Sequence, residues 1–250
     1  MHYLDYAATA PVPRAVADAM TDVLTRGYGN PSSQHGLGRE ARARLDRDRE
    51  TVAGALGCRA EQLFFTSCGT ESDNWAIRAA LRQNRRVGKH IVATAVEHSA
   101  VLQCLKALEE EGYLVTRLKP DSRGRVTAAQ VAEALREDTA LVTMMLVNNE
   151  TGVRFPVEEV AALLKDRPAL LHTDAVQGFL EVPFTAKSLG ADYISLSAHK
   201  IGGPKGIGGL YIGGKAKNAQ PLLYGGGQER GLRPGTEATA QIAGFARAVE

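Results

Sequence analysis

The sequence has few cysteines, few aromatic residues and no long apolar run. Its three cysteines fit no zinc-ligand spacing, which argues against a disulfide scaffold and a metal module and predicts a reduced, cytoplasmic protein without a metal site. The longest apolar runs, such as 140–147, fall far short of the ~18 residues that a membrane-spanning helix needs. The first residues contain neither a basic nor an apolar stretch, so we expect no secretory signal peptide.

The sequence also lacks a large excess of charge of either sign, because 30 basic and 28 acidic residues leave a formal net charge of +2. A chain without a strong excess of either sign has no electrostatic reason to bind nucleic acid or an anionic membrane, so we expect neither partner. Segment 39–50 is rich in arginine, but its acids alternate with its bases, as on a solvent-exposed helix with i,i+4 ion pairs.

Short apolar runs alternate with amphipathic stretches, which is typical of a parallel sheet with helical crossovers. The last two strands are joined by the loop 198–207 without a helix, which predicts an antiparallel strand at the edge of the sheet. The last helix stops without a capping glycine, which indicates that the natural protein continues. We expect strands at 63–66, 90–94, 114–118, 141–146, 169–173, 193–197 and 208–212. We expect helices at 13–25, 38–56, 71–82, 99–111, 127–137, 157–165 and 236–250.

Polar side chains follow five of the predicted strands, at the edge where open parallel sheets bind ligands. The turn 67–72 contains Gly69 and Thr70 and opens a helix, whose free amides suit a phosphate, although the same residue types also form an ordinary helix N-cap. The other strand ends carry His98, Asn149, Asp174, Gln177, Ser197, His199 and Lys200.

These side chains fit the chemistry of pyridoxal 5′-phosphate. A lysine such as Lys200, desolvated by apolar neighbours, has a lowered pKa and can form a Schiff base with an aldehyde. A carboxylate such as Asp174 can keep a pyridine nitrogen protonated, which makes the ring an electron sink, and an imidazole can stack on the ring. The segment 209–216 nearly matches a phosphate-binding P-loop, but Ala216 stands where Ser or Thr must ligate magnesium.

From Tyr3 to Glu250 the sequence resembles the class V aminotransferase-fold cysteine desulfurases of the NifS/IscS type. The order and spacing of the matching segments carry this resemblance. They are 3–9 (YLDYAAT), 29–33 (GNPSS) with His35, 65–74 (FTSCGTESDN), Glu97 with His98, 148–152 (NNETG), 172–177 (HTDAVQ), 197–200 (SAHK), 203–208 (GPKGIG) and 233–237 (RPGTE).

The resemblance implies a role for each matching polar residue. Lys200 would hold the cofactor covalently and move the substrate α-proton, and His98 would stack on the ring and take part in proton transfer. Asp174 would pair with the ring nitrogen, and Gln177 would bond the ring hydroxyl oxygen. Asn149 would help to hold the substrate. Gly69, Thr70, Ser197 and His199 would bind the phosphate, and Thr236 would reach the phosphate site of a partner subunit in a homodimer.

The implied fold is the three-layer α/β/α large domain of a fold type I, aspartate aminotransferase-like transferase, with a mostly parallel seven-stranded sheet. Residues 14–250 would form this domain, and residues 1–13 would pack with a smaller C-terminal domain that lies outside this chain. That domain would hold the persulfide cysteine and an arginine for the substrate carboxylate. The implied activity converts L-cysteine to L-alanine and passes sulfur, as a persulfide, to an iron–sulfur scaffold or another acceptor protein.

Two alternatives stay open at this point. The protein could be another class V enzyme, such as a selenocysteine lyase or an aminotransferase, or a non-catalytic fragment that binds the cofactor. Because the persulfide cysteine would lie elsewhere, we expect this chain to bind the cofactor but to release little sulfide. We expect Cys68 to be a small buried residue and Cys58 and Cys104 to lie in the core of helical segments.

Overall fold

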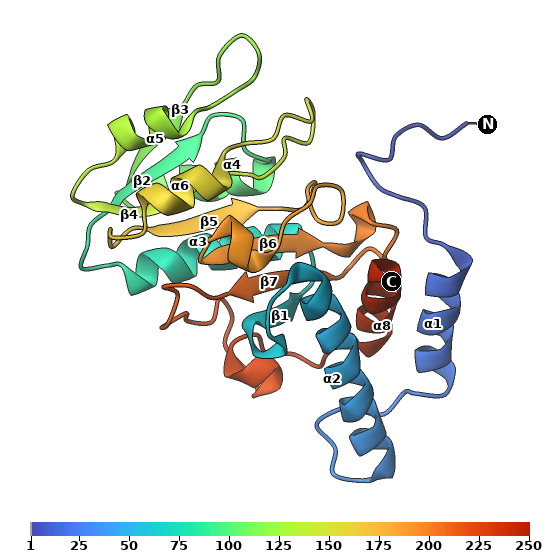
Figure 1. Ribbon diagram of the computed structural model, residues 1–250. Coiled ribbons are helices and arrows are strands. Elements are labelled where there is room, and N and C mark those ends of the chain that lie inside the picture. Colours follow the sequence, from blue (N-terminus) through green and yellow to red (C-terminus); the bar gives the residue numbers. More distant parts are fainter. Residues whose placement is uncertain (1) are drawn as a thin grey trace.

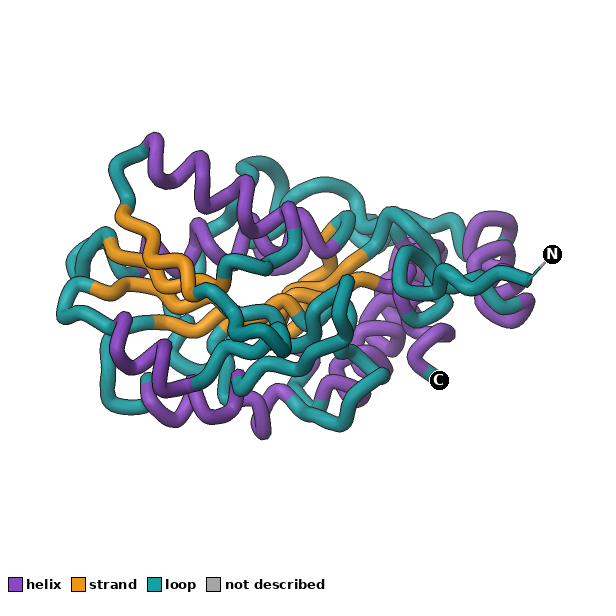
Figure 2. The backbone as a smooth tube through the Cα atoms, turned by 90° about the horizontal axis from the view of Figure 1, so that it is seen from above, coloured by secondary structure: helices purple, strands orange, loops and turns teal. Residues whose placement is uncertain are grey.

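A computed structural model describes residues 2–250, and Met1 lies outside the described residues. Within them, seven strands form a sheet in the order β1-β7-β6-β5-β4-β2-β3, with helices on both faces (Figure 1, Figure 2). The predicted three-layer α/β fold is therefore confirmed. The strands are β1 (Leu63–Thr66), β2 (His90–Thr94), β3 (Leu114–Leu118), β4 (Thr139–Thr143), β5 (Leu170–Asp174), β6 (Tyr193–Ser197) and β7 (Gly208–Ile212). The helices are α1 (Arg14–Thr25), α2 (Gly36–Leu56), α3 (Gly69–Gln83), α4 (Ser99–Glu110), α5 (Ala128–Ala134), α6 (Val157–Leu163), α7 (Ala186–Leu189) and α8 (Thr239–Val249), with 3₁₀ turns η1 (Ala60–Gln62), η2 (Ala198–Lys200) and η3 (Gln228–Gly231).

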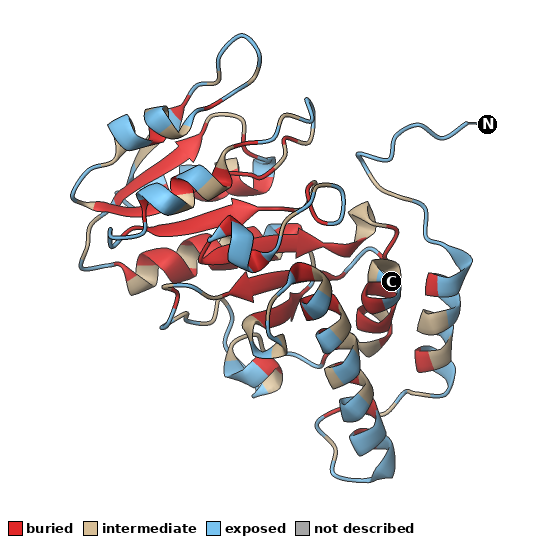
Figure 3. Ribbon diagram, viewed as in Figure 1, coloured by how far each residue is buried: buried red, intermediate tan, exposed pale blue. Residues whose placement is uncertain are grey.

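The core has two parts because successive residues of a strand point to opposite faces of the sheet. One face packs against α3 and α4, through side chains such as Trp75 and Leu105. The other face packs against α2, α5, α6, α7 and α8, through side chains such as Val160 and Phe245. Figure 3 shows the central strands buried along their whole length, while the outer sides of the helices are exposed. Because both faces are covered, every residue of each strand except those of the edge strand β3 is buried.

Strand β7 runs antiparallel, as predicted, but it does not form the edge of the sheet. It lies between β6 and β1 and pairs Gly208 with Ser197 on one side and with Thr66 on the other. The predicted edge position is therefore wrong. The short loop after β6 folds β7 back beside it, and β1, the first strand in the chain, then pairs with the outer side of β7.

The remaining differences lie at the ends of elements. Strand β4 begins two residues before the predicted 141–146 and ends three residues before its end, and α5, α6 and α8 are shorter than expected. Helix α2 begins earlier than predicted because His35 caps it, with Nδ1 accepting a hydrogen bond from Gly38 N at 3.3 Å. The four-residue α7, capped by Thr185, was not predicted. No helix among residues 2–250 is long and apolar enough to cross a membrane.

The outer edge of β1 is closed by side chains instead of another strand. Arg49 of α2 and Glu229 of η3 form a buried, two-pronged ion pair with N···O distances of 2.7 and 2.5 Å. Arg49 Nη1 also donates to Leu63 O at 2.9 Å, and Phe65 N donates to Glu229 Oε2 at 3.0 Å. The ion pair thus satisfies backbone groups that an edge strand otherwise leaves unpaired.

We expect Glu229→Gln to lower the free energy of unfolding by about 3 kcal/mol, because it leaves the Arg49 charge buried and unpaired. Urea unfolding followed by circular dichroism measures the change. Glu61→Gln is the control, since Glu61 and its partner Arg59 are exposed and 3.7 Å apart, and it should have a much smaller effect. Equal effects of the two substitutions would contradict the role given to the buried pair.

Candidate active site

A cavity of about 310 Å³ opens where the parallel strands end, and polar side chains from distant parts of the chain line it. The parallel order of β4, β5 and β6 brings their carboxyl ends to one rim, as expected for an open α/β sheet. The structure brings together here all of the site residues predicted from the sequence except Thr236. They are Gly69, Thr70, His98, Asn149, Asp174, Gln177, Ser197, His199 and Lys200.

One end of the cavity is formed by the N-terminus of α3 and the end of β6. The first amides of a helix have no acceptor within the helix, and the helix dipole favours an anion there. A Cβ on Gly69 would lie 2.8 Å from Val176 Cγ2 and 3.6 Å from Ser197 Cβ, so glycine keeps this space open. The side chains of Thr70 and Ser197 line the same cavity. Helix amides together with hydroxyls suit a phosphate group.

Gly208 allows the two sides of this end to approach each other. It begins β7, which separates the turn after β1 from the end of β6 by a single strand. A Cβ at this position would lie 2.7 Å from both the Cys68 carbonyl carbon and the Leu196 carbonyl oxygen. A larger residue would therefore push the N-terminus of α3 away from β6.

Asp174 ends β5 and is 6% exposed. Its carboxylate accepts a hydrogen bond from Val176 N at 2.9 Å. Burial raises the pKa of the Asp174 carboxyl, and the neighbouring Asp73 carboxyl raises it further, while His98 acts in the opposite direction. A cation placed against this carboxylate, such as a protonated pyridine nitrogen, would keep it ionised.

His98 is held by the helix that it begins. It is the N-cap of α4, and its Nδ1 accepts a hydrogen bond from Ala100 N at 3.2 Å. A neutral His98 ring therefore carries its proton on Nε2. The backbone bond fixes the ring at the cavity wall, where it can contact a planar ligand.

Two adjacent asparagines follow β4, and the first holds the loop while the second lines the cavity. Asn148 is buried, and its side chain holds the loop, with Oδ1 accepting from Thr151 N at 2.9 Å and Nδ2 donating to Val96 O at 3.0 Å. Asn149 lines the cavity. The buried asparagine thus presents the second one to a ligand.

Lys200 lies in η2, directly after β6. Burial lowers the pKa of its amino group, against the opposing effect of the Asp174 and Asp5 carboxylates, as the sequence predicted. Its Nζ donates hydrogen bonds to the backbone oxygens of Ala7 and Ala8 at 2.5 and 3.0 Å. The N-terminal segment therefore covers the lysine.

Two further site residues contact the same N-terminal segment. Gln177 Nε2 donates to Ala7 O at 2.8 Å, and His199 Nδ1 lies 3.3 Å from Thr9 Oγ1. Burial lowers the pKa of the His199 ring, and the positive charge of Lys200 lowers it further. His199 is therefore a neutral donor or acceptor at neutral pH.

The whole described chain, residues 2–250, matches the model of the aminotransferase class-V family. The chain belongs to this family. It is 46% identical over 248 residues to a cysteine desulfurase of Nostoc sp., a match that covers 99% of this chain and 62% of that protein. It is similar to the solved structure of a NifS-like protein, with a TM-score of 0.94, 42% identity and coverage of 98% and 67% of the two chains. It is also similar to SspA in complex with cysteine, with a TM-score of 0.95, 37% identity and coverage of 100% and 72%.

The chain spans between 61% and 65% of the length of the curated relatives that it matches, such as the cysteine desulfurase IscS of Methanosarcina thermophila at 61%. The comparisons show the family and the fold of this chain. The activity of the longer relatives is a property of whole proteins, and for this chain it supports only a proposal.

The cysteines of the chain differ in part from the prediction. Cys68 was expected to be buried, but it is half-buried and lines the cavity, because it is the N-cap of α3. Cys58 lies just beyond the end of α2 instead of inside a helix, although it packs against the core. Cys104 is buried in α4, as predicted.

Thr236 is the predicted site residue that lies outside the cavity lining, and it is exposed. Its segment is attached to the first turn of α3 by an ion pair between Arg233 and Glu71, with N···O distances of 2.9 and 3.1 Å. An exposed threonine at this place can face another subunit. Its role in a partner's phosphate site stays a prediction.

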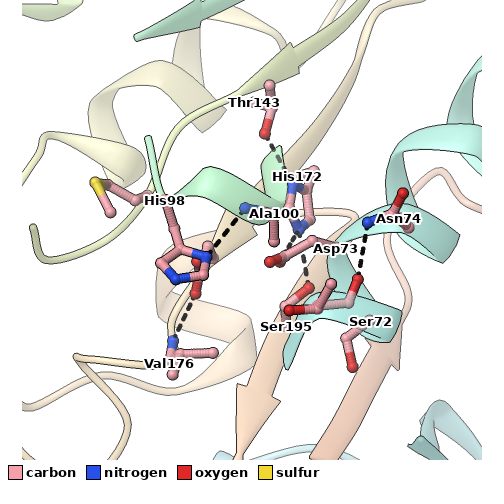
Figure 4. A network of polar contacts seen from close by, with 12 residues as sticks. Ser72, Asp73, Asn74, His98, Ala100, Thr143, His172, Val176 and Ser195 are labelled. Atoms are coloured by element: carbon pink, nitrogen blue, oxygen red, sulfur yellow. Dashed lines mark hydrogen bonds and ion pairs between the residues drawn. The ribbon is translucent and has the colours of Figure 1, made fainter. Parts of the chain in front are cut away.

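Sequence reasoning missed Asp73, a buried carboxyl that lines the cavity. It follows Gly69 by four residues, and that spacing is the signal that could have found it, because residues i and i+4 share one face of a helix. Figure 4 shows Asp73 directed toward His172. The ligand atoms of Asp73, His98 and Asp174 lie within 4.8 Å of one another.

We expect iodoacetamide at pH 8 to modify Cys68 first. Burial raises the pKa of the Cys58 and Cys104 thiols to about 11, so about one in a thousand of each is the reactive thiolate at this pH. Mass spectrometry of peptides after timed labelling measures the order. Cys68→Ser should abolish the fast reaction, and faster modification of Cys58 or Cys104 would contradict the assignment.

Proposed function

We propose that this chain is the pyridoxal 5′-phosphate-binding large domain of a cysteine desulfurase, which converts L-cysteine to L-alanine and passes the sulfur on as a protein-bound persulfide. The observation that carries the proposal is the convergence of Lys200, Asp174 and the N-terminus of α3 on one cavity. An aldehyde, a pyridine nitrogen and a phosphate are the parts of this cofactor that need partners, and each has a matching group here.

The geometry of the residues present fits this cofactor. The space that a Cβ of Gly69 would fill adjoins the helix amides, where a phosphate is bound most favourably. The buried Asp174 carboxylate has a backbone bond from Val176 N, and its remaining acceptor capacity suits the ring nitrogen. Gln177 would bond the ring hydroxyl oxygen, and His98 would stack on the ring. The phosphate would be held by Gly69, Thr70, Ser197 and His199, with Thr236 reaching the site of a partner subunit.

When bound, pyridoxal phosphate supplies an electron sink that weakens the Cα–H bond of an amino acid. Lys200 is suited to remove this proton, because burial lowers the pKa of its amino group and favours the uncharged base. His98 uses Nδ1 to accept from the backbone, which leaves Nε2 for proton exchange. Asn149, positioned by the buried Asn148, would help to hold the substrate.

The choice of L-cysteine as substrate is supported by the relatives. Proteins that match nearly the whole chain are named cysteine desulfurases, and the similar SspA was solved in complex with cysteine. The persulfide cysteine and the arginine for the substrate carboxylate would lie in a smaller C-terminal domain. This chain by itself would then bind the cofactor but release little sulfide.

Other parts of the proposal concern partners. The N-terminal segment would pack with the smaller domain, which is supported by the exposure of Leu4 (89%) and Tyr6 (56%). The exposed Thr236 supports a homodimer. The sulfur would pass to an iron–sulfur scaffold or a similar acceptor protein, and three free cysteines suit a reducing compartment such as the cytoplasm.

Borohydride reduction of the chain incubated with pyridoxal phosphate should fix the cofactor permanently on Lys200. Lys200 lines the cavity and has a lowered pKa, whereas Lys215 is engaged by the backbone oxygens of Leu164 and Ala169 at 2.9 and 2.6 Å. Mass spectrometry of peptides locates the modification. Lys200→Arg should remove it, and a modification on Lys205 or Lys215 of the unaltered chain would contradict the proposal.

We expect Asp174→Asn to retain the cofactor but to slow exchange of the L-cysteine α-proton with deuterated water by at least about 100-fold. Asparagine keeps the shape of the side chain and removes the negative charge opposite the ring nitrogen, and each tenfold loss corresponds to ~1.4 kcal/mol. Proton NMR of L-cysteine measures the exchange. Unchanged exchange would exclude the role of Asp174, and exchange absent even from the unaltered chain would favour a non-catalytic fragment.

A further inference from the structure

Two buried carboxyl groups lie next to each other at the cavity. Asp73, on the first turns of α3, is 1% exposed, and Asp174, at the end of β5, is 6% exposed. Their nearest ligand atoms lie within 4.8 Å of each other and of the His98 ring. Two like charges this close and this deeply buried repel strongly, so a proton is retained by the pair at pH values where exposed carboxyls have lost theirs.

The hydrogen bonds of the two carboxyls are unequal. Asp174 accepts a bond from Val176 N at 2.9 Å, which favours its charged form. Asp174 also acts on Lys200, whose ammonium form it stabilises. No donor among residues 2–250 makes a hydrogen bond of good geometry to the buried Oδ1 of Asp73, and only the Ser195 hydroxyl acts against the effect of burial on its pKa. His98 and Lys200, which can carry a positive charge, act on Asp174 instead. The charged form is therefore favoured at Asp174, and the proton is favoured at Asp73.

A short buried network that includes His172 can accept a hydrogen bond from a protonated Asp73 carboxyl (Figure 4). His172 Nδ1 lies 2.8 Å from Thr143 Oγ1, and its Nε2 lies 2.9 Å from Ser195 Oγ and 3.5 Å from Asp73 Oδ1. Complete burial lowers the pKa of the His172 ring to about 4, so it is neutral at physiological pH. It offers Asp73 an acceptor and no positive charge.

We propose that Asp73 carries a proton while Asp174 is ionised, so that Asp73, backed by His172 and Ser195, is a positioning residue that keeps a single negative charge at this wall of the cavity. In the proposed function, on which this reading of the site rests, that single charge is the one that faces the cofactor's ring nitrogen. If Asp73 were ionised as well, it would compete with Asp174 for the proton of the ring nitrogen.

The other titratable groups around Asp73 do not change this assignment. Burial raises the pKa of Glu97, before α4, to about 8, and that of the Cys104 thiol in α4 to about 11, so both are mostly neutral near pH 7. His98 and Lys200 act on Asp174, and His172 of β5 is neutral. The groups near the pair that can carry a positive charge, His98 and Lys200, thus favour the ionised form of Asp174 over that of Asp73.

The proposal makes the stability of the cofactor-free chain depend on pH. Burial raises the pKa of Asp73 to about 7, far above the ~3.9 of an aspartate in an unfolded chain. Between these two values the folded chain keeps a proton that the unfolded chain has lost, so the Asp73 contribution to stability falls as pH rises. The asparagine of the Asp73→Asn variant cannot ionise in the folded or the unfolded chain, so the variant does not lose this stability as pH rises.

We therefore expect the melting temperature of Asp73→Asn, minus that of the unaltered chain, to increase from pH 5 to about pH 7 and to level off above it, without cofactor. Differential scanning fluorimetry measures it. Asp166→Asn, a substitution of an exposed aspartate, is the matched control and should show a constant difference. A difference for Asp73→Asn that stays constant or decreases with pH would overturn the proposal.

A second measurement locates the proton directly. Carboxyl carbon NMR of the cofactor-free chain labelled at aspartate, assigned with Asp73→Asn and Asp174→Asn, should show Asp73 protonated and Asp174 ionised at pH 6. The reverse assignment would overturn the proposal, and the spectrum of the unaltered chain decides it even if Asp73→Asn fails to fold. Neither measurement involves pyridoxal phosphate, so a failure here is distinct from a failure of the borohydride experiment.

Discussion

The insertion of β7, antiparallel, between β1 and β6 is the constraint on which the arrangement of the cavity depends. It places the N-terminus of α3 one strand away from the end of β6, so helix amides and the Ser197 hydroxyl face the same space. Two glycines make this approach possible, because a Cβ at Gly69 or at Gly208 would meet neighbouring atoms at 2.8 or 2.7 Å. Lys200 then follows β6 by three residues and reaches the same cavity.

The interior around this cavity favours uncharged side chains. Burial raises the pKa of Asp73, Glu97 and Asp174 and lowers that of His172 and Lys200. A ligand that brings its own charges therefore meets a site with few fixed charges to oppose it. The same burial strengthens each remaining electrostatic contact, because the effective dielectric constant is lower inside the protein than in water.

Features that depend on neighbouring residues could be predicted from the sequence, and features that depend on distant pairing could not. The strand ends that carry Asp174 and Lys200 could be predicted because each polar residue follows a local apolar run. The place of β7 could not, since its partner β1 lies far earlier in the chain and nothing local indicates which strand edge stays unpaired. Asp73 was missed because a carboxylate in a helix is usually exposed, and its burial depends on His172 and Ser195 from other strands.

The closed edge of β1 has a consequence for the order of folding. Glu229 lies 164 residues after Phe65 and 180 residues after Arg49, so the side chain that covers this strand is synthesised long after the strand itself. Until then, the outer backbone groups of β1 are an open template to which a strand of another chain could add. We expect the nascent protein to be most prone to aggregate during this interval, when β1 has emerged from the ribosome and η3 has not.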